Sequence, residues 1–309
     1  IPAVSGVQAK DQDRVETVTY RKDAQKAVIR YVSTNGNRVL TTDEVTGKSG
    51  EAIAYSTTSQ ITEFKKQGYN LVSDEFTSGG AKVYDYDTAR DQVYTVTLSE
   101  RVEPVNPDNP TPQPNTPVNP GQPDSPRWPG TVENLDNKES VSRTIHYVYE
   151  DGSKAKDDVV ETLNFKRWSN VNLVTGHIDF QDWTTNDDTF DKVVSPTIAG
   201  YTADKSEIPA VSGVQAKDQD RVETVTYRKD AQKAVIRYVS TNGNHVLKTD
   251  EVTGKSGEAI AYSTTNQINE FKKQGYKLVS DEFTAGGAKV YDYDTRSEEH
   301  TSELQSPAM

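Results

Sequence analysis

Hydrophobic and polar residues alternate along most of the chain with the two-residue period of β-strands. Residues 26–32 predict a strand, the pair Asn35-Gly36 predicts a hairpin turn, and residues 38–45 predict the returning strand. Further strands are predicted over 69–75, 81–86 and 92–100. This part of the chain is therefore expected to be rich in β-structure.

One segment has helical spacing instead. In residues 57–67, Ile61 and Phe64 share a helix face, Thr57 can cap the first turn, and Gly68 can end the helix. The predicted order over residues 24–101 is two strands, a helix and three strands. It indicates a small α+β module with one helix packed across a β-sheet.

A second kind of module is expected over residues 132–230. Residues 141–149 predict a strand, 150–153 a turn, 159–168 a returning strand and 222–227 a closing strand. The stretch between the last two strands has a weaker pattern. The chain thus contains two different small β-rich modules.

These modules are repeated in tandem. Residues 1–88 recur at 208–295 with six differences, so 88 − 6 = 82 positions are identical. Residues 1–23 are interpreted as the C-terminal remnant of a module of the second type, and 231–295 as a second copy of the first type. Such repetition favours a protein that acts through multiplicity over an enzyme with one active site.

The two copies diverge after Thr88 and Thr295. The first continues into the predicted strand 92–100, whereas the second continues with a string that resembles the translation of a common sequencing-adapter oligonucleotide. We interpret residues 296–309 as an artefactual tail outside the fold. The module at 231–295 is then expected to lack its last strand and to be the least stable module.

Residues 102–131 contain ten of the fourteen prolines. Proline fixes φ and removes a backbone donor, so a regular helix or sheet is not expected there. The segment is interpreted as an extended, semi-rigid linker between modules.

Composition excludes several classes of function. The net charge is −12, the pI is about 4.9, the mean hydropathy is −0.79 and cysteine is absent. An acidic chain without a basic stretch is not expected to bind nucleic acid or an anionic membrane surface. Absent cysteine rules out disulfides and thiol chemistry. No apolar run is long enough for membrane insertion.

Catalytic and metal-binding groups are also scarce. Outside residues 296–309 the histidines are His146, His177 and His245, and Arg38 replaces His245 in the other copy. A position that accepts arginine is a poor catalytic base, so no catalytic residue and no cofactor are predicted. The acidic stretch Asp179–Asp191 could hold Ca²⁺, but it lacks an EF-hand pattern, and a solvated loop is favoured; no metal site is predicted.

The sequence resembles a known family. Residues 25–32, 46–51 and 64–74 resemble the MucBP module of lactobacillal mucus-binding proteins, and 143–152 with 196–201 resemble the companion B2-like module of the Mub repeat. The resemblance implies ubiquitin-like β-grasp modules in a cell-wall-anchored, extracellular adhesin of lactic acid bacteria. It implies host mucin glycoproteins as partners, with immunoglobulins as a second class of partner.

Tyrosine supplies the candidate binding residues. Tyr84 and Tyr86 lie two positions apart, as do Tyr291 and Tyr293, so each pair is predicted to share a strand face. Aromatic faces suit the apolar C–H faces of sugar rings, although core packing is the competing interpretation. The predicted function is non-catalytic binding of mucin glycans through multivalent weak contacts. The alternative is a structural stalk that projects a distal binding domain.

Overall fold

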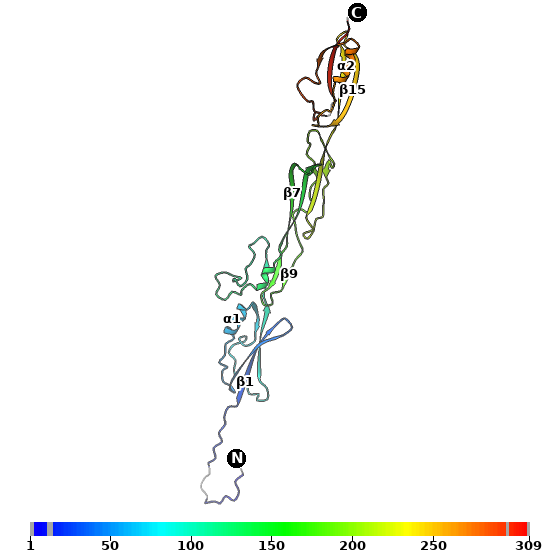
Figure 1. Cartoon of the computed structure of the whole chain (residues 1–309). Helices are drawn as coiled ribbons and strands as arrows, with labels where there is room; N and C mark the ends of the chain where they lie inside the picture. Colours follow the sequence, from blue (N-terminus) through cyan, green and yellow to red (C-terminus); the bar gives the residue numbers. More distant parts are fainter. Residues whose placement is uncertain (1–2, 11–14, 295–296, 308–309) are drawn as a thin grey trace. The chain divides into compact units, whose positions relative to one another are not determined.

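The computed structural model describes residues 3–10, 15–294 and 297–307 (Figure 1). The chain divides into two compact units. Unit 1 comprises residues 1–138 and 166–184, and unit 2 comprises residues 139–165 and 185–309. Each unit contains one helix-containing module and one part of the B2-like region.

The first module of unit 1 is a four-stranded mixed sheet with one helix, so the predicted α+β character is confirmed. Strand β1 lies between β2, its antiparallel partner, and β4, its parallel partner, and β3 pairs with β4. The elements are β1 (Ala24–Ser33), β2 (Val39–Lys48), α1 (Thr58–Lys66), β3 (Tyr69–Asp74) and β4 (Gln92–Glu100). The strand predicted over 81–86 does not form. In its place, Val83 makes an isolated β-bridge to Ala52.

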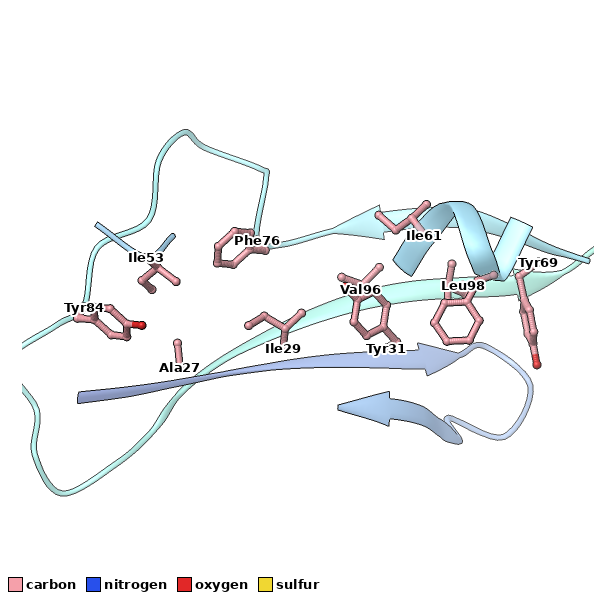
Figure 2. Close-up of a cluster of buried hydrophobic side chains, with 11 residues drawn as sticks. Ala27, Ile29, Tyr31, Ile53, Ile61, Tyr69, Phe76, Tyr84, Val96 and Leu98 are labelled. Carbon is pink, nitrogen blue, oxygen red and sulfur yellow. The ribbon is translucent and has the colours of Figure 1, made fainter. Parts of the chain in front are cut away.

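The core of this module lies between the sheet and the helix (Figure 2). Alternate residues of β1 point inward, and Ile29 and Tyr31 are fully buried. Ile61 and Phe64 cover them from the predicted face of α1. Thr57 precedes α1 as predicted, but its side chain does not cap the helix, because its hydroxyl donates instead to Asp74 Oδ2 at 2.6 Å.

The rest of unit 1 contains a three-stranded antiparallel sheet of order β5-β8-β9. A short 3₁₀ helix packs against this sheet. The elements are β5 (Val102–Val105), η1 (Gly130–Asn134), β8 (Ser169–Asn172) and β9 (Ile178–Phe180). Its core is formed by Val105, Val132, Val171 and Leu173, with Trp128 packed against it. Residues from both ends of the proline-rich segment therefore belong to a folded domain.

The prediction of an extended linker over residues 102–131 is wrong. Val102–Val105 is a strand, and four successive turns follow in which a backbone N–H donates to the carbonyl three residues earlier, at 3.1 to 3.3 Å. The turns are Asn106–Asn109, Gln113–Thr116, Asn119–Gln122 and Gln122–Ser125. Proline is the second residue of each turn, where a fixed φ favours the turn and no N–H is needed.

Unit 2 begins with the other part of the B2-like region. Its main sheet has the order β11-β13-β6-β7, in which β13 runs parallel to β6, and β10 and β12 form a second, two-stranded sheet. The elements are β6 (Lys138–Tyr149), β7 (Lys154–Lys166), β10 (Val193–Val194), β11 (Tyr201–Ala203), β12 (Glu207–Ile208) and β13 (Arg221–Lys229). Arg143 is buried here, and its Nε donates to Glu161 Oε2 at 2.7 Å.

The second helix-containing module completes unit 2. Its sheet has the order β15-β14-β17-β16, which matches the order in the first module. The elements are β14 (Ala231–Ser240), β15 (His245–Lys255), α2 (Thr265–Lys273), β16 (Lys277–Asp281) and β17 (Glu298–Gln305).

Strand β17 corrects two expectations: that the second module lacks its last strand, and that residues 296–309 lie outside the fold. Glu298–Gln305 pairs in parallel with β14 and antiparallel with β16. Strand β17 fits into the sheet because its alternate residues Ser302 and Leu304 are fully buried. They lie opposite Tyr238 and Ser240 of β14. Val96 and Leu98 hold the corresponding places in the first module. Residues 295–296 and 308–309 lie outside the described residues.

Candidate functional site

The structure separates the tyrosines that were predicted to share a strand face. Tyr84 and Tyr291 are each 3% exposed, whereas Tyr86 is 79% and Tyr293 54% exposed. The prediction of a shared face is wrong because residues 81–86 do not form a strand, so the two-residue spacing has no fixed direction.

Tyr84 and Tyr291 are core residues. Figure 2 shows Tyr84 beside Ala27 and Ile53 at one end of the hydrophobic cluster. Its ring packs against Gly47, where a Cβ would lie 2.1 Å from Tyr84 Cε2, and Tyr291 has the same relation to Gly254. These two rings have no face available to a ligand.

Tyr86 and Tyr293 lie at the surface, each with its hydroxyl over a glycine of a turn, Gly50 and Gly257 respectively. Tyr293 has a second contact, with Gly200 of the B2-like part of unit 2. Of the four predicted tyrosines, Tyr293 is therefore the one placed beside a concave surface that sequence reasoning did not identify.

That surface is a tyrosine-lined hollow of about 380 Å³. It is lined by Tyr149, Glu150, Asp151, Ser153, Tyr201, Tyr227 and Lys229. Three neighbouring strands bring the rings together: Tyr227 of β13 pairs with Tyr149 of β6, and Tyr201 of β11 pairs with Lys229. The hollow thus lies at one end of the sheet, where the turn after β6 and the start of β11 meet.

The aromatic rings form one wall of the hollow. The Tyr149 and Tyr201 rings lie 4.7 Å apart at 45°, and both side chains are half-buried. Tyr227 is fixed below them, since it is 1% exposed and its hydroxyl donates to the Pro196 carbonyl. Half-buried rings offer an apolar face beside a hydroxyl, the combination that sugar rings require.

Charged groups form the rim. The Ser153 hydroxyl and N–H both donate to Asp151 Oδ1, at 2.5 and 2.9 Å, and they hold the pKa of the Asp151 carboxyl below its ordinary value. Glu150 pairs with Arg228 at 3.3 Å, and Lys229 with Glu258 at 3.9 Å. Burial raises the pKa of the Tyr201 hydroxyl, and nearby Tyr149, Tyr293 and Asp151 raise it further. The rim offers acceptors and donors to sugar hydroxyls.

The other candidate groups are dispersed. His146 Nδ1 lies 2.9 Å from Asp158 Oδ2 on an exposed strand surface. Among the described residues, which include the acidic stretch Asp179–Asp191, no three His, Asp or Glu side chains gather where they could hold a metal ion. Within the same residues no helix has the length and apolarity needed to cross a membrane.

The sequence contained a signal for the hollow. Tyr149 directly precedes the predicted turn at 150–153, and Tyr201 directly follows Gly200. Both lie in the stretches that carry the resemblance to the B2-like module. Their proximity could not be deduced from spacing, because it depends on the parallel pairing of β13 with β6.

Alternating small β-rich modules, repeated along one chain, define a tandem-repeat protein. The profile of the Muc B2-like domain matches residues 132–231, and that of the mucin binding domain matches residues 25–100 and 232–304. The chain belongs to the mucus-binding repeat family, with domains of the Mub and MucBP types.

The chain is similar to several solved structures. The crystal structure of Mub-RV is 26% identical, with a TM-score of 0.53, and the match covers 67% of this chain and 99% of that one. The type 2 repeat of the mucus binding protein MUB from Lactobacillus reuteri is 28% identical, with a TM-score of 0.45 and coverages of 67% and 100%. The MucBP domain of the adhesion protein from Pediococcus pentosaceus is 36% identical, with a TM-score of 0.27 and coverages of 29% and 98%.

No protein of curated function matches the sequence of this chain. The matched families are binding repeats and not enzymes. One of the two families is a mucin binding domain, and an immunoglobulin partner is not supported.

Proposed function

We propose that this chain is part of an extracellular, cell-wall-anchored adhesin that binds host mucin glycans without catalysis. The observation that carries the proposal is the tyrosine-lined hollow, in which the Tyr149 and Tyr201 rings lie beside Asp151 and Lys229. Membership of the mucus-binding repeat family supports it. The sheet order β2-β1-β4-β3 with one packed helix supports the β-grasp assignment of the MucBP modules.

Binding at one hollow is expected to be weak. A volume of about 380 Å³ lies near the lower end of the range for ligand pockets, roughly 300–1,000 Å³. Exposed rim charges add little, because solvent screens them. Useful adhesion would come from several repeats that engage one mucin chain, since linkage makes each later contact intramolecular.

The rim favours neutral sugars. Asp151 places a carboxylate beside the rings, whereas Glu150 is paired with Arg228 and Lys229 with Glu258. A sialylated or sulfated sugar would meet like charge there. Neutral mucin sugars are therefore the expected ligands of this hollow.

The test compares the full chain with two variants on immobilised mucin. Tyr201→Ala removes one ring of the hollow and should weaken binding about tenfold, the cost of one lost aromatic platform. Tyr86→Ala removes a more exposed tyrosine outside the hollow and should leave binding unchanged. Loss of binding with Tyr86→Ala alone would instead support the site predicted from the tyrosine pairs.

The structural stalk is the second candidate, and the contacts between modules favour it. In unit 1, the Arg101 N–H donates to the Gly68 carbonyl at 2.8 Å, and the Leu173 N–H donates to the Arg101 carbonyl at 2.9 Å. Such backbone bonds fix one module against the next. A correctly folded full chain with no affinity for mucin would support the stalk and overturn the adhesin proposal.

A further inference from the structure

Two hairpin turns carry the same Asn-Gly pair in different surroundings. Residues 33–37 and 240–244 share the sequence Ser-Thr-Asn-Gly-Asn, and they join β1 to β2 and β14 to β15. Both Asn-Gly pairs lie at the surface, and the backbones are alike, with a φ of +70° at Gly36 and +78° at Gly243. The two turns therefore form a matched pair that shows how its surroundings act on an asparagine.

An asparagine that precedes a glycine can modify itself. The backbone nitrogen of the glycine loses its proton and attacks Cγ of the asparagine side chain. A bond forms between this nitrogen and Cγ, the bond between Cγ and Nδ2 breaks, and ammonia leaves. Water then opens the cyclic imide and leaves aspartate or isoaspartate. Glycine favours the attack because it has no Cβ to hinder its nitrogen.

Both turns leave the glycine free to react. Among the described residues, no atom lies within 4 Å of the position that a Cβ would take on Gly36 or Gly243, so the imide ring has room. In the same part of the chain, the backbone N–H of neither glycine donates to an acceptor. No backbone hydrogen bond of the glycine has to break before its nitrogen attacks.

The Asn35 side chain is restrained. Its Nδ2 donates to Glu100 Oε1 at 3.2 Å. The other oxygen of this carboxylate accepts a hydrogen bond from Asn172 Nδ2 at 2.7 Å. Asn172 is the last residue of β8, so the B2-like part of unit 1 holds Glu100 in place. Because Nδ2 of Asn35 leaves as ammonia, its hydrogen bond to Glu100 must break during the reaction.

The Asn242 side chain lacks this restraint. The sheet register puts Ser306 where Glu100 stands in the first module. The Ser306 hydroxyl lies 2.6 Å from the Ser240 hydroxyl and bonds to it instead. Over the residues that the structure describes, no hydrogen bond involves the Asn242 side chain, although the Asn242 N–H donates to Ser240 Oγ at 3.3 Å.

We propose that Asn242 is a site of self-modification, converted to aspartate and isoaspartate by attack of the Gly243 nitrogen, and that Glu100 protects Asn35 from the same reaction. Each conversion replaces a neutral amide with a carboxylate and so makes the chain more acidic. The isoaspartyl product also carries an additional methylene group in the backbone of the turn, where the pairing register of β14 with β15 is set. The proposal does not depend on glycan binding.

Peptide mapping by mass spectrometry tests the proposal in the full chain, incubated folded in mildly alkaline buffer. Trypsin releases residues 31–38 and 238–248, which differ in length and mass. Fragment spectra locate the change, because each peptide also contains the second asparagine of its turn. Digestion in heavy-oxygen water labels conversions that occur during digestion, since water supplies the new carboxylate oxygen.

Asn242 should convert about fivefold faster than Asn35, as expected when the slower reaction waits for one hydrogen bond to open. Equal rates, or a faster rate at Asn35, overturn the proposal. So does an Asn242 that stays unconverted in the folded chain while it converts in the unfolded chain.

The unfolded chain supplies the control for local sequence. In concentrated guanidinium chloride the bond to Glu100 is lost, and the two sequences first differ after the turn, at Arg38 and His245. The rates at Asn35 and Asn242 should then be equal. A difference as large as that in the folded chain would trace the effect to Arg38 and His245 and overturn the proposal.

Three variants test the protection itself. Glu100→Ala removes the acceptor and should raise the Asn35 rate to that of Asn242. Asn172→Ala frees one oxygen of Glu100 without a change in β4 and should raise the Asn35 rate by a smaller factor. The control Glu63→Ala removes an exposed carboxylate from α1 of the same module and should leave the rate unchanged. Amide signals of β1 show that each variant is folded. An Asn35 rate that neither Glu100→Ala nor Asn172→Ala raises overturns the proposal.

Discussion

The ring of Tyr293 packs against Gly200, and the two residues join the MucBP module of unit 2 to the B2-like region before it. A Cβ on Gly200 would lie 2.5 Å from Tyr293 Cδ1 and 3.0 Å from Ser256 Cβ, so a larger residue does not fit without displacement. Nearby, the Thr202 hydroxyl donates to Asp230 Oδ1 at 2.5 Å. Tyr86, the counterpart in the first module, is more exposed, at 79% against 54%.

Gly200→Ala should therefore expose Tyr293. The added methyl group displaces the ring, and a φ of +76° adds strain for alanine. Hydroxyl-radical footprinting with mass spectrometry measures the exposure of each tyrosine separately, because Tyr86 and Tyr293 fall in different tryptic peptides. In the wild-type chain Tyr86 should react faster, and in Gly200→Ala the Tyr293 rate should rise toward that of Tyr86.

The control is Gly213→Ala. Gly213 has a φ of +74°, but a Cβ there meets nothing within 4 Å, so this variant carries the backbone strain without the clash. Its Tyr293 rate should equal that of the wild type. Equal rates in Gly200→Ala and Gly213→Ala would show that the contact does not protect Tyr293.

The folded proline turns predict resistance to protease. The bond after Arg127 lies in a hairpin in which the Trp128 N–H donates to the Thr116 carbonyl at 3.0 Å. Trypsin should cut there much more slowly than after Lys22, which precedes the first strand. Gly121→Ala should accelerate cleavage after Arg127, because Gly121 has a φ of +89° in its turn. If trypsin cleaves after Arg127 as fast as after Lys22, the interpretation of this segment as an extended linker would be supported instead.

The proline-rich segment shows what sequence reasoning captured and what it missed. Proline content alone predicts an extended chain, but the order of the residues also matters. Asn or Gln precedes the proline of each turn, and in two of the four turns Asn115 or Gly121 follows the proline with a positive φ. That order favours turns. Packing of Trp128 against the core that contains Val171 then fixes these turns, and this packing between distant parts of the sequence could not be predicted from the local pattern.

Local alternation and helical spacing predicted β1, β2 and α1 well, because both periods reflect which face is buried. The same logic failed for Tyr84 and Tyr86, where no strand maintains the period. The tail was a different case: Ser302 and Leu304 follow strand alternation, but the resemblance to a translated adapter oligonucleotide led to the prediction that residues 296–309 lie outside the fold. The tyrosine-lined hollow depends on strand pairing between distant residues, which no local pattern encodes.

The second MucBP module should lose stability in acid through Asp281. Burial raises the pKa of the Asp281 carboxyl, but hydrogen bonds from Thr264, Ser302, Thr284 and the Phe283 N–H outweigh it and lower the pKa below its ordinary value. A lowered folded-state pKa stabilises the fold above the ordinary pKa of about 4, and that contribution is lost as the pH falls through the folded value.

Asp281→Asn should therefore destabilise the module at pH 7 and have a smaller effect near pH 3. Urea titration followed by the amide signals of α2 measures the difference at each pH. The control Glu270→Gln changes an exposed carboxylate on the same module, paired with Lys273. An Asp281→Asn effect of the same size at both pH values would contradict the role of the charged carboxylate.

Adhesion to mucin should be stronger near pH 4.5 than at pH 7. The chain carries a net charge of −12, and mucins are anionic, so partial protonation of carboxylates reduces repulsion between them. Asp151 has a lowered pKa and keeps its charge to lower pH, so the gain does not arise from this carboxylate. The ratio of the amounts of chain bound at pH 4.5 and at pH 7 should therefore be the same in Asp151→Asn as in the unmodified chain. Adhesion that is unchanged or weaker at pH 4.5 contradicts this prediction.

The second MucBP module should still be less stable than the first, although its sheet is complete. Ser302 occupies the buried place opposite Tyr238 that Val96 occupies opposite Tyr31, and His300 replaces Tyr94 opposite Ile236. A buried hydroxymethyl group contributes about 1–2 kcal/mol less to the free energy of unfolding than a buried isopropyl group does. The Ser302 hydroxyl recovers part of this through its bond to Asp281 Oδ1 at 2.9 Å.

Hydrogen exchange of backbone amides in β14 and β1 measures this difference within one molecule. Amides of β14 should exchange about tenfold faster than their counterparts in β1, as a deficit of about 1.4 kcal/mol requires. Val96→Ser in the first module should bring β1 close to the rate of β14, since it removes the same apolar group and Asp74 lies beside that position. Equal protection of β1 and β14 in the unmodified chain would show that Ser302 and His300 do not weaken the second core.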